Sequence, residues 1–230
     1  MKALINFEFC NRFAQAIGVE GISLYPYNRL DAPVSCHADM LFCVIGDTVF
    51  CYKDYVEEFD LLNVLENSGK KIIFVKKQCS KNYPDDVSLN VLVVGKKLFC
   101  NKKYVAVEII EFAEKNNYKI IDVKQGYAAC STLILDKGYA ITSDNGMAKA
   151  LKAEGVSVFP FPNDNIVLQG YNCGFVGGAS AVIGDKVFLS GTQKCYERIC
   201  GFLDFIESAG YFIEFVPCDK IYDFGGVKFI

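Results

Sequence analysis

The sequence predicts a single α/β domain over residues 1–230, built from five similar units closed into a ring, that is, a five-fold pseudosymmetric α/β propeller. Two observations predict this fold. A pattern of strand, strand, helix and strand recurs along the chain, and such self-similarity is typical of repeat architectures. The two ends also carry complementary halves of one unit, and joining them would cover two exposed sheet edges. No linker divides the chain.

Composition limits the possible classes of function. Hydrophobic residues make up 52% of 230 residues, enough for a substantial core, and the net charge is −3 with no basic patch. We therefore expect no nucleic-acid partner. Every apolar run is shorter than the ~20 residues of a membrane helix, and no signal peptide is evident. We expect a cytoplasmic protein with no membrane contact, and its oligomeric state is left open.

One unit is split between the termini, which makes the expected fold circularly permuted. The N-terminal part supplies a strand, a helix and a strand, at residues 2–6, 11–17 and 21–25. The C-terminal part, residues 223–230, supplies the first strand, because Gly225-Gly226 there matches Gly177-Gly178 in another unit.

Units A to D lie between these halves, each with two strands, a helix and a last strand. Unit A is expected at 37–46, 47–51, 56–66 and 71–75, and unit B at 86–95, 97–100, 104–115 and 119–123. Unit C is expected at 130–135, 139–142, 146–154 and 156–159, and unit D at 177–184, 186–190, 196–208 and 212–216. Gly46-Asp47, Gly95-Lys96 and Gly184-Asp185 are the hairpin signals.

Eleven cysteines form no CxxC pair, and the chain has one histidine. Without an export signal, most of these thiols are expected to be reduced and to serve as small apolar residues. We expect no metal and no cofactor.

His37 is the most informative residue, since any imidazole chemistry must use it. Asp39 follows two residues later, and both side chains would share one face of an extended strand. A carboxylate there would orient the imidazole or hold a cation. The alternative is a hydrogen-bonded histidine with no chemical role.

Cys130 opens unit C and is the candidate nucleophile, with Ser131 beside it as a hydrogen-bond donor. Its place in unit C falls near that of His37 in unit A, and a thiolate beside a protonated histidine is nucleophilic at neutral pH. The alternative is a buried structural thiol. Cys36 and Cys173 are rivals, because each lies beside a unit entrance.

Two further acids, Asp86 and Asp223, stand at the entrances of unit B and of the split unit. If the entrances converge, these carboxylates surround Cys130 and His37 and suit a cationic substrate such as a guanidinium. The alternative is turn and cap chemistry, which commonly uses aspartate. Gly177 and Gly178 fit no nucleotide-binding motif, and close backbone approach explains them.

The five units resemble the pentein fold of the guanidino-modifying enzymes, which include arginine deiminase, dimethylarginine dimethylaminohydrolase and the amidinotransferases. The resemblance covers the whole chain and is to a bacterial group assigned to this fold. It implies a site on the ring axis, where a cysteine attacks the guanidinium carbon, a histidine acts as acid and base, and carboxylates hold the cation.

The family's motifs can be placed on this sequence. His37-Ala38-Asp39 looks like the family's HxD motif, and Ala129-Cys130-Ser131 is similar to the nucleophile strand of dimethylarginine dimethylaminohydrolase. Gly177-Gly178 matches the family's GGD motif, but Ala179 stands where its carboxylate is expected. The C-terminal strand, which carries the cysteine in an unpermuted member, has none.

Two hypotheses follow. The first is a hydrolase or amidinotransferase acting on a C–N bond of a guanidino or amidino compound, through a covalent S-alkylthiouronium intermediate. Cys130, His37 and Asp39 would be catalytic, and Asp86, Asp223, Ser131, Gly177 and Gly178 would bind the small cationic substrate. The alternative is a non-catalytic pentein scaffold that binds a protein, a ribosomal or a small-molecule partner, which the missing carboxylate at Ala179 favours.

Overall fold

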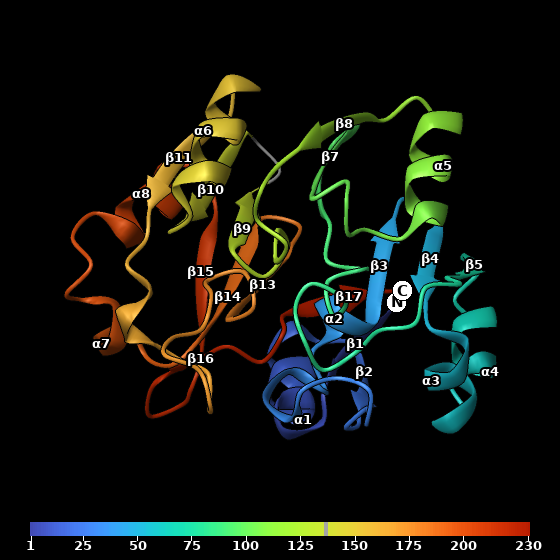
Figure 1. The fold of residues 1–230 in the computed structure, drawn as a ribbon. Coiled ribbons are helices and arrows are strands. Elements are labelled where there is room, and N and C mark those ends of the chain that lie inside the picture. Colours follow the sequence, from blue (N-terminus) through green and yellow to red (C-terminus); the bar gives the residue numbers. More distant parts are fainter. Residues whose placement is uncertain (136–137) are drawn as a thin grey trace.

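A computed structural model describes residues 1–135 and 138–230 of the chain. These residues form a mixed α/β fold with five three-stranded sheets that share one plan, and none of the sheets closes on itself (Figure 1). The middle strand of each sheet pairs antiparallel with one neighbour and parallel with the other. A parallel pair needs a crossover, and a helical segment supplies it in every unit.

The split unit is one sheet made from both ends of the chain. Residues Ala3 and Phe229 are partners in the antiparallel pair, and the backbone of Lys2 also bonds to Ile230. The predicted pairing of the terminal segments is confirmed, and Figure 1 places the two termini beside each other. The elements are β17 (Val227–Phe229), β1 (Lys2–Asn6), α1 (Phe7–Ile17) and β2 (Glu20–Leu24).

Unit A departs from the sequence prediction in its helix. One helix was expected over residues 56–66, but the chain turns at Asp60, whose φ is 51°, and starts a second helix. The amide of Leu61 donates to the carbonyl of Val56 and closes this turn. After the short η1 (Ala32–Val34) and α2 (Ala38–Leu41), the elements are β3 (Phe42–Ile45), β4 (Thr48–Cys51), α3 (Lys53–Glu58), α4 (Leu62–Glu66) and β5 (Lys71–Phe74).

Units B and C keep the predicted order, with a single helix each. Asp144 caps the helix of unit C, because its Oδ1 accepts a 2.7 Å hydrogen bond from the amide of Met147. Unit B contains β6 (Leu92–Val94), β7 (Lys97–Cys100), α5 (Val107–Lys115) and β8 (Lys119–Asp122). Unit C contains β9 (Thr132–Leu135), β10 (Tyr139–Thr142), α6 (Asn145–Ala153) and β11 (Ser157–Pro160).

Unit D also breaks its predicted helix. The single helix expected over residues 196–208 is wrong, because Gly201 adopts a left-handed φ of 76° between two shorter helices. The unit contains β13 (Ser180–Ile183), β14 (Lys186–Ser190), α7 (Gln193–Tyr196), α8 (Phe202–Ser208) and β15 (Phe212–Val216). Before this unit, the short η2 (Asn163–Asn165) leads into β12 (Ile166–Val167). This strand pairs with β16 (Ile221–Tyr222), which follows the unit.

The unit entrances are turns rather than strands, which corrects the expected starts at residues 37, 86, 130, 177 and 223. In units A, C and D a helix-like turn ends at the residue just before the first strand. The amides of Leu41, Ser131 and Ala179 donate to the carbonyl four residues earlier. The first strands are therefore shorter than predicted, and the entrance residues curve across the ends of the sheets.

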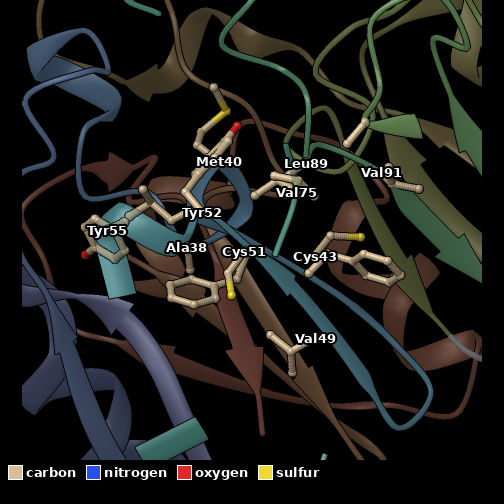
Figure 2. Packing of buried hydrophobic residues seen from close by; sticks show 14 of the residues in the cluster. Ala38, Met40, Cys43, Val49, Cys51, Tyr52, Tyr55, Val75, Leu89 and Val91 are labelled. Carbon is tan, nitrogen blue, oxygen red and sulfur yellow. The ribbon is translucent and has the colours of Figure 1, made fainter. Parts of the chain in front are cut away.

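Neighbouring sheets share their hydrophobic cores. One cluster joins the split unit to units A and B, another joins B to C, a third joins C to D, and a fourth joins D back to the split unit. Figure 2 shows part of the first, where Ala38 and Met40 of α2 lie among buried residues of β3, β4 and the unit B entrance. Within the described ranges, no helix is both long and apolar enough to cross a membrane.

Candidate functional site

Several unit entrances meet at a cavity of about 240 Å³. Its wall combines one titratable cluster with apolar and aromatic side chains. The lining includes His37, Met40, Tyr127, Cys130, Phe175 and Asp223. Two of the three residues predicted to be catalytic, Cys130 and His37, thus face the same space, together with the acid of the split unit.

The backbone places His37 at the N-cap of α2, where its carbonyl accepts hydrogen bonds from the amides of Met40 and Leu41. On the other side, Gly225 lies directly against the histidine at a φ of 82°. Any side chain at Gly225 would collide with the Cα, Cβ and ring of His37. Gly225, which the sequence comparison aligned with Gly177, therefore allows the C-terminal segment to approach His37 closely.

Asp223 is the acid nearest to this histidine. Its Oδ1 lies 3.7 Å from Nδ1 of His37, too long for a good hydrogen bond but close enough for strong electrostatic interaction. Its Oδ2 accepts a 2.8 Å bond from the amide of Phe175, and Oδ1 accepts a 3.1 Å bond from the amide of Gly225. Burial raises the pKa of Asp223 to about 6, although a charged His37 opposes the rise.

The side chain of Asn90 donates a hydrogen bond to the Cys130 thiol. Asn90 was not identified as a site residue from the sequence. Its Nδ2 lies 2.9 Å from Sγ of Cys130 and 3.4 Å from Sδ of Met40. Its Oδ1 accepts a 2.8 Å hydrogen bond from the amide of Ala129. Asn90, Met40 and Cys130 each stand two residues before the first strand of their unit. Equivalent positions of three units therefore meet at the thiol.

The surroundings of the Cys130 thiol favour its neutral form. Burial raises its pKa well above the usual range, and the carboxylates of Asp39 and Asp223 raise it further. Asn90 acts in the opposite direction by donating to the sulfur. A change that neutralises either carboxylate would favour the thiolate.

Asp39 lies beneath this thiol. Its carboxyl interacts with the Cys130 thiol strongly enough for each to shift the pKa of the other, and its buried Oδ1 has no hydrogen-bond partner among the described residues. Burial raises the pKa of Asp39, while His37 and Lys228 oppose the rise. The expectation that His37 and Asp39 share one face of a strand is wrong, because both belong to the α2 turn. Asp39 instead lines a second cavity of about 210 Å³, together with Lys228.

The other predicted binding residues lie behind the cavity wall. Asp86 is buried and accepts a 2.6 Å hydrogen bond from the hydroxyl of Tyr127, whose ring lines the cavity. Its other oxygen has no partner, and burial raises its pKa. Ser131 is fully buried and donates to the carbonyl of Ala128. It stabilises the turn that carries Cys130.

Gly177 and Gly178 bring the entrances of units C and D together. The amide of Gly178 donates to the carbonyl of Cys130, and its own carbonyl accepts from the amides of Phe224 and Gly226. A Cβ at Gly178 would collide with the Asp223 carboxylate, and one at Gly177 with carbonyls of the Cys130 turn. Close backbone approach, as inferred from the sequence, accounts for both glycines.

The rival cysteines occupy different places. Cys36 lines a neighbouring groove of about 560 Å³, and burial raises its pKa to about 11. Cys173 is half-buried and lines the same cavity as Cys130. In the described part of the chain, no three His, Cys, Asp or Glu side chains are grouped to hold a metal ion.

Comparison with solved structures gives the same fold at low sequence identity. The amidinotransferase SxtG, from the saxitoxin pathway of Microseira wollei, matches with a TM-score of 0.58 and 15% identity over 91% of this chain and 73% of that one. DDAH from Pseudomonas aeruginosa, in complex with citrulline, matches with a TM-score of 0.55 and 11% identity over 93% and 83%. The N-terminal domain of ArgZ, a cyanobacterial arginine dihydrolase, matches with a TM-score of 0.54 and 11% identity over 91% and 78%.

These matches establish that the chain has the pentein fold of the guanidino-modifying enzymes. At the level of sequence, no curated protein matches the chain. A family described as "Family of unknown function (DUF6873)" matches residues 5–228.

Proposed function

Because this chain belongs to the DUF6873 family and has the fold of the guanidino-modifying enzymes, we propose that it cleaves a C–N bond of a guanidino or amidino cation by cysteine catalysis. The observation that carries the proposal is the shared cavity, in which Cys130, His37 and Asp223 face one space. Cys173 lines the same cavity, and Cys36 and Cys218 line the neighbouring groove, which His37 and Asp223 also line. Among the described residues, Cys130 is distinguished from these cysteines by the hydrogen bond that its sulfur accepts from Asn90.

In this proposal the five sheets are the blades of an α/β propeller around one axis, and the chain is circularly permuted. Two features support it. Neighbouring sheets share cores in a continuous cycle, so each unit packs between two others. Met40, Asn90 and Cys130 occupy equivalent positions, and Asn90 contacts the other two, as expected for residues around a common axis.

The reaction begins when the Cys130 proton passes to solvent and Sγ attacks the amidino carbon. The C–N bond to the leaving group breaks, and a protonated His37 donates its proton to the departing amine. The intermediate is an S-alkylthiouronium. Neutral His37 then removes a proton from water, or from an acceptor amine, which attacks the same carbon. The C–S bond breaks, and the released thiolate takes a proton from solvent to give the thiol, while His37 stays protonated for the next cycle. Water gives a hydrolase, and an amine gives an amidinotransferase.

The charges around Cys130 would make its thiol more reactive when a cationic substrate is bound. The carboxylates of Asp39 and Asp223 raise the pKa of Cys130. A bound guanidinium would offset their charge and lower that pKa, so the cation itself favours the thiolate. In this scheme Asp223 contacts the cation, and Asp39, which lines the second cavity, attracts it electrostatically. Asp86 acts through Tyr127, and Ser131, Gly177 and Gly178 hold the backbone around Cys130 and Asp223.

Labelling with chloroacetamidine, a cationic alkylating reagent, tests the proposal. Peptide mass spectrometry follows all eleven cysteines at neutral pH, with neutral chloroacetamide as the matched reagent. We expect chloroacetamidine to label Cys130 selectively and faster than chloroacetamide does, and His37→Gln to change its pH profile. Labelling of the eleven thiols in order of exposure alone, with Cys130 unlabelled, would refute a catalytic role.

A second candidate function is a non-catalytic scaffold that binds a small cation in the same cavity. Ala179 favours it, because the carboxylate expected after Gly178 is missing at that position. In that case Cys130→Ser would keep cation binding, and no guanidino compound would be consumed by the wild-type protein.

A further inference from the structure

The cavity beside Cys130 is walled mainly by apolar and aromatic side chains. Tyr127 and Phe175 form one side, with ring centroids 6.1 Å apart and planes inclined by 34°. Tyr171, Leu168 and Val34 complete the wall toward the outside. Such a surface gains free energy when it is covered by an apolar or aromatic group.

The charges around this cavity are acidic. Asp223 lines it directly. Asp86 and Asp31 lie behind the phenols of Tyr127 and Tyr171, which donate to them at 2.6 and 3.0 Å. Among the described residues that line the cavity there is no lysine or arginine.

The basic groups nearest in the fold face elsewhere. Arg12 lies in the neighbouring groove, with its guanidinium 3.6 Å from Sγ of Cys218. Lys228 lines the second cavity, under Asp39. Arg29 pairs with Asp54 at 2.9 Å. Within the cavity, His37 is the one described lining group that can carry a positive charge, and it already faces Asp223 at 3.7 Å. A carboxylate on a ligand would therefore meet acids and aromatic faces without an unpaired cation, which is costly in a poorly solvated site.

We propose that the substrate is a guanidine or amidine whose substituent is neutral and apolar or aromatic, with no carboxylate. This inference rests on the proposed function and names the substrate class of that site. The cationic head lies toward Asp223 and Cys130, and the substituent lies against Tyr127, Phe175 and Leu168. Free α-amino acids such as arginine are excluded by the charge of the wall.

Protection against labelling tests the substrate class. Chloroacetamidine labelling of Cys130 is measured with rising concentrations of benzylguanidine or of arginine. We expect benzylguanidine to halve the labelling rate at a concentration at least tenfold below that of arginine. Equal protection by arginine would overturn the substrate class while leaving cysteine catalysis intact. A failure of chloroacetamidine to label Cys130 at all would instead overturn the proposed function.

A substitution that adds the missing cation sharpens the test. Asn172 is exposed and lines the cavity, so Asn172→Arg places a guanidinium at its mouth without disturbing the core. We expect this variant to gain protection by arginine at least tenfold. Gln169→Arg is the matched control, because Gln169 is exposed and lines only the neighbouring groove. An equal gain in both variants, or none in Asn172→Arg, would contradict the assignment.

Discussion

The side-chain nitrogen of Asn90 lies 2.9 Å from the sulfur of Cys130. The same amide accepts a backbone hydrogen bond from Ala129 through its oxygen and donates to the carbonyl of Asp39 through its nitrogen. One buried side chain thus positions the thiol and ties the entrance of unit B to those of units A and C.

Replacing this amide should damage both stability and thiol reactivity. Asn90→Leu keeps the volume but leaves the amide of Ala129 without its acceptor, and we expect a loss of about 1–3 kcal/mol in the free energy of unfolding. The Cys130 pKa should rise further, because the hydrogen bond to sulfur is lost, and labelling should slow. Urea unfolding and labelling kinetics measure the two effects. Asn101→Leu, at a more exposed amide bonded to Lys124, is the control and should change neither by as much.

Asp39→Asn should activate the thiol toward neutral reagents. The Asp39 carboxylate raises the pKa of Cys130, so its removal lowers that pKa and increases the thiolate fraction. We expect faster labelling by chloroacetamide at pH 7.5 and a smaller preference for chloroacetamidine, since one attracting charge is gone. Glu214→Gln, at an exposed pair with Lys186, serves as the comparison. A slower reaction with chloroacetamide would mean that Asp39 acts as the base of the thiol.

Stability should increase as the pH falls from 7.5 to 5. Asp223 has a pKa of about 6 in the folded protein against a usual value of 3.8. The folded state therefore binds its proton more tightly than the unfolded state, and its destabilising charge is removed as the pH falls through 6. The gain from this group at pH 5 is about 1 kcal/mol. Asp39 and Asp86 shift in the same direction. Urea unfolding at several pH values should show the increase, and Asp223→Asn should reduce it.

Gly178→Ala should disrupt the site through packing alone. The added methyl group would collide with the carboxylate of Asp223, whose position is fixed by two backbone hydrogen bonds. Overpacking of this kind costs about 1–3 kcal/mol. Gly146→Ala in α6 is the control, because that glycine has an ordinary helical backbone and a Cβ there would meet only the Asp144 side chain, at 3.1 Å, so its cost should be much smaller. Thermal unfolding followed by circular dichroism should give a clearly lower melting temperature for Gly178→Ala than for Gly146→Ala.

The sequence predicted the repeating plan of the sheets because hairpin glycines and alternating apolar runs are local signals. The split unit was predictable for the same reason, since both of its halves carry the pattern. The broken helices at Asp60 and Gly201 were not predictable, because the apolar spacing continues across each break and the backbone reversal depends on packing. Propensity is a weak guide where tertiary contacts decide.

For the site, the sequence revealed candidate residues of rare types, but it did not reveal how their side chains are arranged in space. His37 stood out as the one histidine, and Cys130 through its place in a repeat. Asn90 was missed because the strand starts were placed too early, which hid its equivalence with Cys130 and Met40. The available signal was an amide within the apolar run from Val87 to Val94. Asp39 was placed on the histidine's face because an extended strand was assumed where a helical turn forms.

The place of Asp223 along the chain has a consequence for synthesis on the ribosome. His37 emerges early, yet its acidic neighbour and the glycine that packs against it are translated after units A to D. Units A to D can form while His37 still lacks its two neighbours from the C-terminal segment. The contacts of His37 with Asp223 and Gly225 therefore form only when the C-terminal segment joins the units that precede it.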